Sequence, residues 1–169
     1  MAEAASTPAR LAVVVGGAGG GGWALARALA ENPTYDRVIV LSRRFPTDMA
    51  LFPSLVAKHL LPLTPRDRPS VLAALSARVG SIGDNQLGGW YGYRASKAAL
   101  NMLIRTLAIE HRRTRPLGVC VALHPGTVDT ALSAPFKAGV ADGRLFTAEQ
   151  SAAALLAVIE GLGPEANGL

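Results

Sequence analysis

The chain has 169 residues, of which 50% are hydrophobic and 17% are charged, and its formal net charge is +5 at pH 7. A chain of this size and composition can bury one core, so we expect a single domain over residues 1–169. No apolar run approaches the roughly 18 residues of a membrane span, and the first ten residues lack a signal-peptide pattern, which predicts a cytoplasmic protein with no membrane partner.

Charge and cysteine content argue against two further classes. The arginines are dispersed apart from the run 111–115, aromatic residues make up 5% of the chain, and no nucleic-acid module is recognisable, so no nucleic-acid partner is expected. We place the run 111–115 at a helix end, where it offsets the helix dipole. Cys120 is the only cysteine, which excludes an intrachain disulfide and a multi-cysteine zinc site, and its apolar neighbours predict a buried core residue.

Apolar runs alternate with segments of helical spacing along the chain. The expected elements, in chain order, are strand 11–15, helix 22–31, strand 37–42, helix 50–62, strand 71–77, helix 91–112, strand 118–123 and helix 147–160. This alternation is typical of an α/β fold with a doubly wound, Rossmann-like parallel sheet, here of four or five strands with helices on both faces. Thr147 and Gln150 have the spacing of a capping box at the start of the last helix.

The strand 11–15 runs directly into seven residues that include six glycines, and a helix follows. The order of buried strand, glycine turn and helix is typical of a dinucleotide site, because glycines let backbone N–H groups approach a pyrophosphate. Gly16, Gly20 and Gly22 fit the spacing G-x-x-x-G-x-G, although so many glycines fit other spacings too. The alternative is a flexible loop.

Tyr93 and Lys97 lie four residues apart at the start of the expected helix 91–112, so both side chains emerge on one face. A nearby ammonium stabilises a phenolate and so makes a tyrosine a better proton donor at neutral pH. This pair is a candidate general acid, and the alternative is an ordinary helix start.

The glycine pattern followed by Tyr-x-x-x-Lys resembles the short-chain dehydrogenase/reductases. The likeness covers most of residues 70–162, where four segments are similar to the C-factor-like branch of that family: 75–82, 88–91, 93–100 and 124–130. It implies an oxidoreductase that interconverts a small carbonyl compound and its alcohol with a nicotinamide cofactor. It further implies that Tyr93 is the general acid/base and that Lys97 activates it and touches the nicotinamide ribose. The residues implied to hold the nicotinamide amide are Gly126, Val128 and Thr130.

In the family, the second serine of a Ser-Ser-x-x-Gly run polarises the substrate carbonyl, and alignment on Gly80 puts Ala77 at that place. We therefore expect Ser81 to take this role, with Ser76 as the second choice. The alternative is that either hydroxyl only caps a turn.

Arg43 follows the strand 37–42, at the position that selects the cofactor in this kind of fold. A guanidinium pairs with the 2′-phosphate of NADP, whereas an acidic residue would bind the ribose of NAD. NADP is therefore the preferred cofactor, with NAD as the second choice. The alternative is that Arg43 is solvated in a surface loop.

A central block of the family fold has no counterpart, because the chain passes from Arg43 almost at once into 52–62, which is similar to a later helix. The asparagine of the family's proton relay is missing with it, and its nearest aligned residue is Met49. Unpaired backbone groups within a sheet are costly, so we expect strand 11–15 to pair directly with strand 71–77. A last strand after 167–169 is also expected to be missing.

Two hypotheses follow from these motifs and this gap. The first is an NADPH-dependent carbonyl reductase, with a homodimer formed through the helix 91–112, whose apolar positions are Leu100, Leu103, Ile104 and Leu107. The second is a catalytically inert relative that acts as a nucleotide-binding or interaction module.

Overall fold

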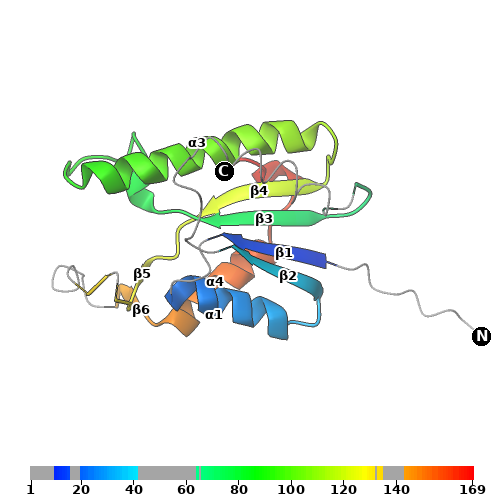
Figure 1. The fold of residues 1–169 in the computed structure, drawn as a ribbon, viewed down its shortest axis with the longest axis horizontal. Coiled ribbons are helices and arrows are strands. Elements are labelled where there is room, and N and C mark those ends of the chain that lie inside the picture. Colours follow the sequence, from blue (N-terminus) through cyan, green and yellow to red (C-terminus); the bar gives the residue numbers. More distant parts are fainter. Residues whose placement is uncertain (1–9, 16–19, 42–63, 65, 132, 135–142) are drawn as a thin grey trace, which may run out of the picture.

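The computed structural model describes residues 10–15, 20–41, 64, 66–131, 133–134 and 143–169 (Figure 1). The expected helix 50–62 and three residues singled out above, Gly16, Arg43 and Met49, lie outside these ranges. The strands are β1 (Arg10–Val15), β2 (Tyr35–Leu41), β3 (Ser70–Leu75), β4 (Gly118–Leu123), β5 (Thr127–Val128) and β6 (Leu145–Phe146). The helices are α1 (Gly20–Glu31), α3 (Tyr91–Arg112) and α4 (Ala148–Glu160), with short 3₁₀ turns η3 (Arg78–Gly80) and η5 (Pro164–Ala166).

Four strands form one parallel sheet in the order β2-β1-β3-β4. β1 pairs directly with β3, with Ala12 opposite Val71 and Val15 opposite Ala74. This pairing confirms the expected contact between the first strand and the strand before the helix 91–112. β5 and β6 form a separate two-stranded parallel sheet.

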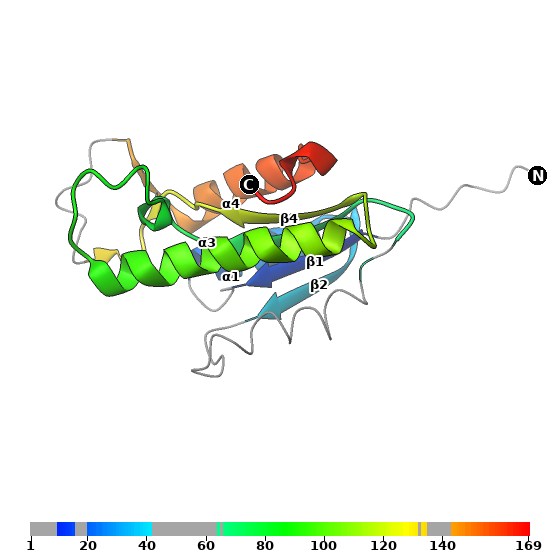
Figure 2. The same ribbon diagram turned by 90° about the horizontal axis from the view of Figure 1, so that it is seen from above.

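Helices cover both faces of the four-stranded sheet, as expected (Figures 1 and 2). α3 packs on one face, over β4, and α1 and α4 pack together on the other. The alternation of side chains along β3 matches these layers. Ala73 belongs to the core shared with α1 and α4, whereas its neighbours Leu72 and Ala74 are buried on the α3 side.

α4 begins as the sequence predicts. The Thr147 hydroxyl accepts a hydrogen bond from the Gln150 backbone N–H, and the Gln150 side chain accepts one from the Thr147 N–H, so the capping box is complete. Three apolar side chains of this helix, Ala152, Leu155 and Ile159, are buried in the core. The cap therefore fixes the start of a helix whose apolar face closes one side of the sheet.

The outer edge of β4 is bonded to the last residues of the chain. The Gly168 N–H donates to the Cys120 carbonyl at 2.8 Å, and the Leu169 carbonyl accepts from the Ala122 N–H at 3.0 Å. Asn167 accepts from the Cys120 N–H through its side-chain oxygen. Cys120 is itself fully buried, as predicted, and burial raises the pKa of its thiol to about 12.

The structure corrects the expected apolar surface on α3. Ile104 and Leu107 are buried in the chain's own core, and Leu100 and Leu103 are half-buried. The large apolar side chains that α3 exposes beyond its first turn are Met102 and Ile109.

In the described part of the chain, no helix combines the length and the apolarity that crossing a bilayer requires.

The basic run 111–115 lies where α3 ends, as expected. His111 and Arg115 are buried at the end of α3, where both contact Thr64. The His111 Nε2 lies 3.1 Å from the Thr64 hydroxyl, and the Arg115 Nε donates to the Thr64 carbonyl at 3.0 Å. Burial lowers the pKa of His111, and the charge of Arg115 lowers it further. His111 is therefore neutral in the folded protein at pH 7.

This burial predicts a pH-dependent stability. The pKa of His111 is lower in the folded than in the unfolded chain, where it is about 6.5, so the unfolded chain binds more protons between those two values. The contribution of His111 to the free energy of unfolding should therefore be complete above about pH 6.5. The free energy of unfolding should fall as the pH drops from there toward the folded-state pKa. Urea unfolding of the wild type and of His111→Gln across this range checks the prediction. His124 remains in both proteins, so identical pH slopes would contradict it.

Candidate functional site

The carboxyl ends of β1, β3 and β4 lie at one edge of the sheet, because the three strands are parallel neighbours (Figure 1). Each strand leads there into a segment that the sequence marks as functional: the glycine run, the serine segment and residues 124–130. α3 extends past this edge with its first turns. Parallel sheets place ligand contacts in this region.

α1 begins at Gly20, so the glycine run leads into the first turn of a helix as the motif requires. Gly20 and Gly22 both belong to this turn, and Gly22 is buried. A helix start carries backbone N–H groups that favour an anion, and glycines there leave room for close approach. Two of the three glycines of the motif are therefore suitably placed, whereas Gly16 lies outside the described residues.

Tyr93 and Lys97 lie on the same face of α3. The Lys97 Nζ is 5.9 Å from the centroid of the Tyr93 ring, and 45% of the Tyr93 surface is exposed. Lys97 donates to the carbonyl of Leu75, the last residue of β3, at 3.0 Å. The sheet therefore positions the ammonium, and the ammonium lies beside an accessible phenol.

Gly80 brings the turn after β3 against α3. A Cβ at this position would lie 2.8 Å from backbone and side-chain carbons of Lys97 and 2.9 Å from the Asn101 amide. Real Cβ atoms do not approach neighbours so closely, so η3 can contact α3 at Lys97 only with glycine at this position. Gly80 thus couples the serine segment to the helix that carries the Tyr-Lys pair.

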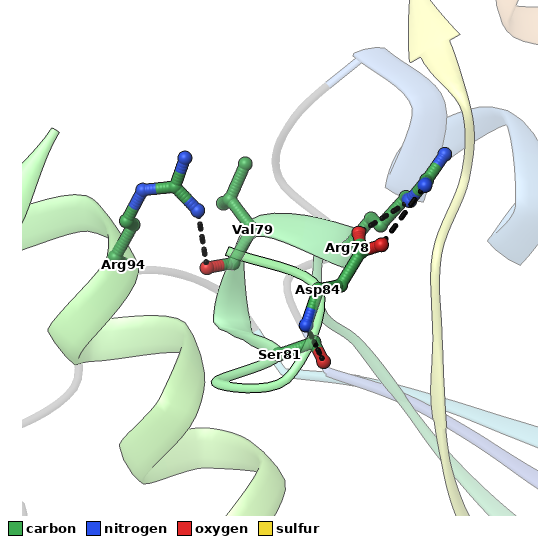
Figure 3. Close-up of polar contacts among 5 residues, drawn as sticks. All are labelled: Arg78, Val79, Ser81, Asp84 and Arg94. Carbon is green, nitrogen blue, oxygen red and sulfur yellow. Dashed lines mark hydrogen bonds and ion pairs between the residues drawn. The ribbon is translucent and has the colours of Figure 1, made fainter. Parts of the chain in front are cut away.

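The two candidate serines have different surroundings. The hydroxyl of Ser76 is buried and donates to the Asn101 side-chain oxygen at 2.6 Å. The hydroxyl of Ser81 is exposed and accepts from the Asp84 N–H at 3.2 Å, as the turn-capping alternative describes (Figure 3). Ala77, at the family's serine position, is half-buried.

Both serines line a cleft of about 620 Å³ between η3, the middle of α3 and the end of β4. Its charged and polar lining also includes Arg78, Asn101, Arg105 and His124. Arg78 makes a two-pronged contact with Asp84, with N–O distances of 2.6 and 3.0 Å (Figure 3). The Arg78 hydrogen bond lowers the pKa of Asp84. This pair could not be predicted from the sequence, because the exposed residues of a short 3₁₀ turn and of the loop after it follow no period.

The segment 125–130 follows β4, and side chains of β6 and α4 contact it. Gly126 has φ +75°, and a Cβ there would lie 2.8 Å from the Phe146 ring. The buried Ser151 of α4 donates to the Pro125 carbonyl at 2.7 Å. Val128 is buried, so it can offer a ligand only its backbone, and Thr130 is half-buried. Phe146 and Ser151 were not predicted, because only the tertiary fold brings them to this segment.

Comparisons with known proteins agree with this arrangement. The short chain dehydrogenase family matches residues 76–141. The C-signal protein of Myxococcus xanthus is 40% identical over 129 residues, which cover 76% of this chain and 71% of that protein. A 1-hydroxy-2-glutathionyl-2-methyl-3-butene dehydrogenase of a Rhodococcus strain is 42% identical over 94 residues, which cover 56% of this chain and 39% of the relative. The chain thus spans 71% of one relative and well under half of the other.

Solved structures share the fold. The carbonyl reductase Sniffer of D. melanogaster has a TM-score of 0.69 at 19% identity, covering 95% of each chain. An NADPH-bound carbonyl reductase from chicken fatty liver has a TM-score of 0.66 at 20% identity, covering 96% of this chain and 91% of the other. At such identities the likeness establishes the architecture alone.

Gly126→Ala should destabilise the protein for two reasons. A side chain disfavours the left-handed conformation by roughly 1–2 kcal/mol, and the new Cβ would also collide with Phe146. Gly143 is a matched control, because it has the same φ of +75° but no atom of the described residues lies within 4 Å of its Cβ position. Urea unfolding should show a larger loss for Gly126→Ala than for Gly143→Ala. Equal losses would mean that the contact with Phe146 imposes no constraint.

Proposed function

The chain belongs to the short-chain dehydrogenase/reductase family of NAD(P)-dependent oxidoreductases, and we propose that it reduces a small carbonyl compound to an alcohol with NADPH in the cytoplasm. One observation carries the proposal. Tyr93 and Lys97 share a face of α3 at the edge of the sheet where the parallel strands β1, β3 and β4 end.

Tyr93 is the general acid of the proposed reduction. Its phenol is accessible, and it donates a proton to the carbonyl oxygen as that oxygen gains negative charge. Lys97 stabilises the phenolate that remains, and its bond to the Leu75 carbonyl keeps the ammonium in place. In the reverse direction the same pair accepts the proton of the alcohol.

Ser81 is the better candidate for polarising the carbonyl. Its oxygen accepts the Asp84 N–H, and a hydroxyl that accepts one hydrogen bond keeps its own O–H to donate. The O–H of Ser76 is already directed at Asn101, within a buried contact. Exposure and donor capacity therefore both favour Ser81.

The residues at this edge fit a nicotinamide dinucleotide. Gly22 is buried in the first turn of α1, and the N–H groups of this turn are assigned to the pyrophosphate together with Gly16 and Gly20. Arg43 is assigned to the 2′-phosphate. The segment with Gly126, Val128 and Thr130 is assigned to the nicotinamide amide. The bound cofactor supplies the hydride.

The proposal includes a homodimer formed through α3. Ile104 and Leu107 cannot contribute, since they are buried within the chain. Met102 and Ile109 are apolar and exposed on the same helix, and they support this contact.

A second function, nucleotide binding without turnover, is favoured by the direct pairing of β1 with β3. Neighbouring strands lie about 4.8 Å apart, so each strand missing between them shifts the glycine side of the site toward the Tyr93 side by that spacing. Hydride transfer requires closer positioning than binding does.

Titration with NADPH and NADH tests the cofactor assignment. We expect saturable binding that raises the thermal midpoint, with tighter binding of NADPH than of NADH. Arg43→Asp should shift the preference toward NADH, because a carboxylate repels the 2′-phosphate. An unchanged preference would mean that Arg43 does not face the ribose.

Tyr93→Phe tests the proton donor. The variant should lose carbonyl reduction while its NADPH affinity stays within about twofold of the wild type, because only the hydroxyl is removed. Tyr91→Phe is the matched control, since Tyr91 is exposed two residues earlier on the same helix. Equal turnover by Tyr93→Phe and the wild type would refute the assignment. NADPH binding without turnover by the wild type would favour the second function.

A further inference from the structure

The segment between η3 and α3 has an unusual backbone just before the helix. Gly88, Gly89 and Trp90 follow one another with φ of 64°, 70° and 48°, all in the left-handed region. Such a conformation is disfavoured for a residue with a side chain such as Trp90, so neighbouring contacts must hold it. Trp90 is also the N-cap residue of α3, and an indole, which has only a donor, cannot accept the first N–H groups of the helix.

Arg94 makes the contacts that this segment needs. Its Nε and Nη2 donate to the Gly88 carbonyl at 3.2 and 3.0 Å, and its Nε also donates to the Gly89 carbonyl at 3.0 Å. Its Nη1 donates to the Val79 carbonyl at 3.3 Å (Figure 3). One side chain on α3 therefore binds both ends of the segment 79–89.

The guanidinium also lies over the Trp90 ring, 5.6 Å from its centroid. Because the guanidinium contacts the Trp90 ring while its N–H groups donate to the neighbouring carbonyls, it can fix both the left-handed backbone and the indole. A lysine would reproduce only part of this arrangement, since an ammonium lacks the planar fork that reaches the Val79 and Gly88 carbonyls together.

We propose that Arg94 is a positioning residue for Tyr93. Arg94 is adjacent to Tyr93 in the first turns of α3, and it fixes the segment 79–90, including Ser81, against that helix. The contacts of Arg94 thus hold the exposed residues 81–90 in a fixed place relative to the start of the helix that carries the phenol. We call the contacts of Arg94 with residues 79–90 the clamp. The effect of the clamp on the reaction rests on the proposed function, whereas the clamp itself does not.

The clamp is tested in the full chain with a single fluorophore. The chain has two tryptophans, and Trp23 is 61% exposed, so Trp23→Phe leaves Trp90 as the only indole. In this background Arg94→Met should raise the acrylamide quenching of Trp90 and accelerate amide hydrogen exchange across residues 82–91. Arg112→Met, at the exposed far end of the same helix, is the control and should change neither. Unchanged quenching and exchange in Arg94→Met would overturn the clamp.

The positioning role is tested on carbonyl reduction by the same variants. Arg94→Met should lower kcat/KM about 10- to 100-fold while the Kd of NADPH stays unchanged, because the cofactor contacts lie elsewhere and only the reacting geometry loosens. Arg94→Lys should recover part of this loss, and it decides the question if the methionine variant does not fold. Altered quenching with unchanged kcat/KM would overturn the positioning role and leave the clamp.

The proposed function can fail separately. If the wild type binds NADPH but reduces no carbonyl compound, the positioning role is overturned together with the proposed function. The clamp is then decided by Trp90 quenching and hydrogen exchange alone, which need no turnover.

Discussion

The hydrogen bonding between β1 and β3 is the interaction on which the rest of the structure depends. β1 leads into the glycine run and α1, and β3 leads through η3 to α3, so their pairing places the two sides of the proposed site next to each other. Without it, two rows of buried N–H and C=O groups would be unpaired, at a cost of about 1–3 kcal/mol each. The stability of a whole domain is only about 5–15 kcal/mol, so the pairing is a condition for folding as well as for function.

The site has a rigid side and a loop side. Lys97 is tied to the end of β3, and Gly80 packs against the same turn of α3, so the Tyr-Lys face is continuous with the sheet. Residues 81–90 are exposed, and Arg94 connects them to that face. Exposed loops on a rigid scaffold are where related enzymes vary their substrates. In this chain Arg94 joins the loop side to the scaffold side through the carbonyls of Val79, Gly88 and Gly89.

Sequence reasoning predicted the regular parts well because they follow local rules. The bounds of α3 and β4 were predicted to the residue, and Thr147 and Gln150 cap α4 as their spacing indicates. The pairing of β1 with β3 followed from the need to satisfy backbone groups. Contacts between distant segments could not be predicted, such as Phe146 on Gly126, nor could the burial of Ile104 and His111, because helical spacing identifies an apolar face without saying what covers it.

The burial of Cys120 gives the protein an internal reporter. It is the only cysteine of the chain, and its high pKa leaves almost no thiolate near neutral pH, so a thiol reagent reaches it only when β4 opens. Its labelling rate then equals the opening equilibrium multiplied by the rate for an exposed thiol, provided that closing is fast. The cooperativity of this narrow sheet can thus be measured in native buffer, without denaturant and without an engineered probe.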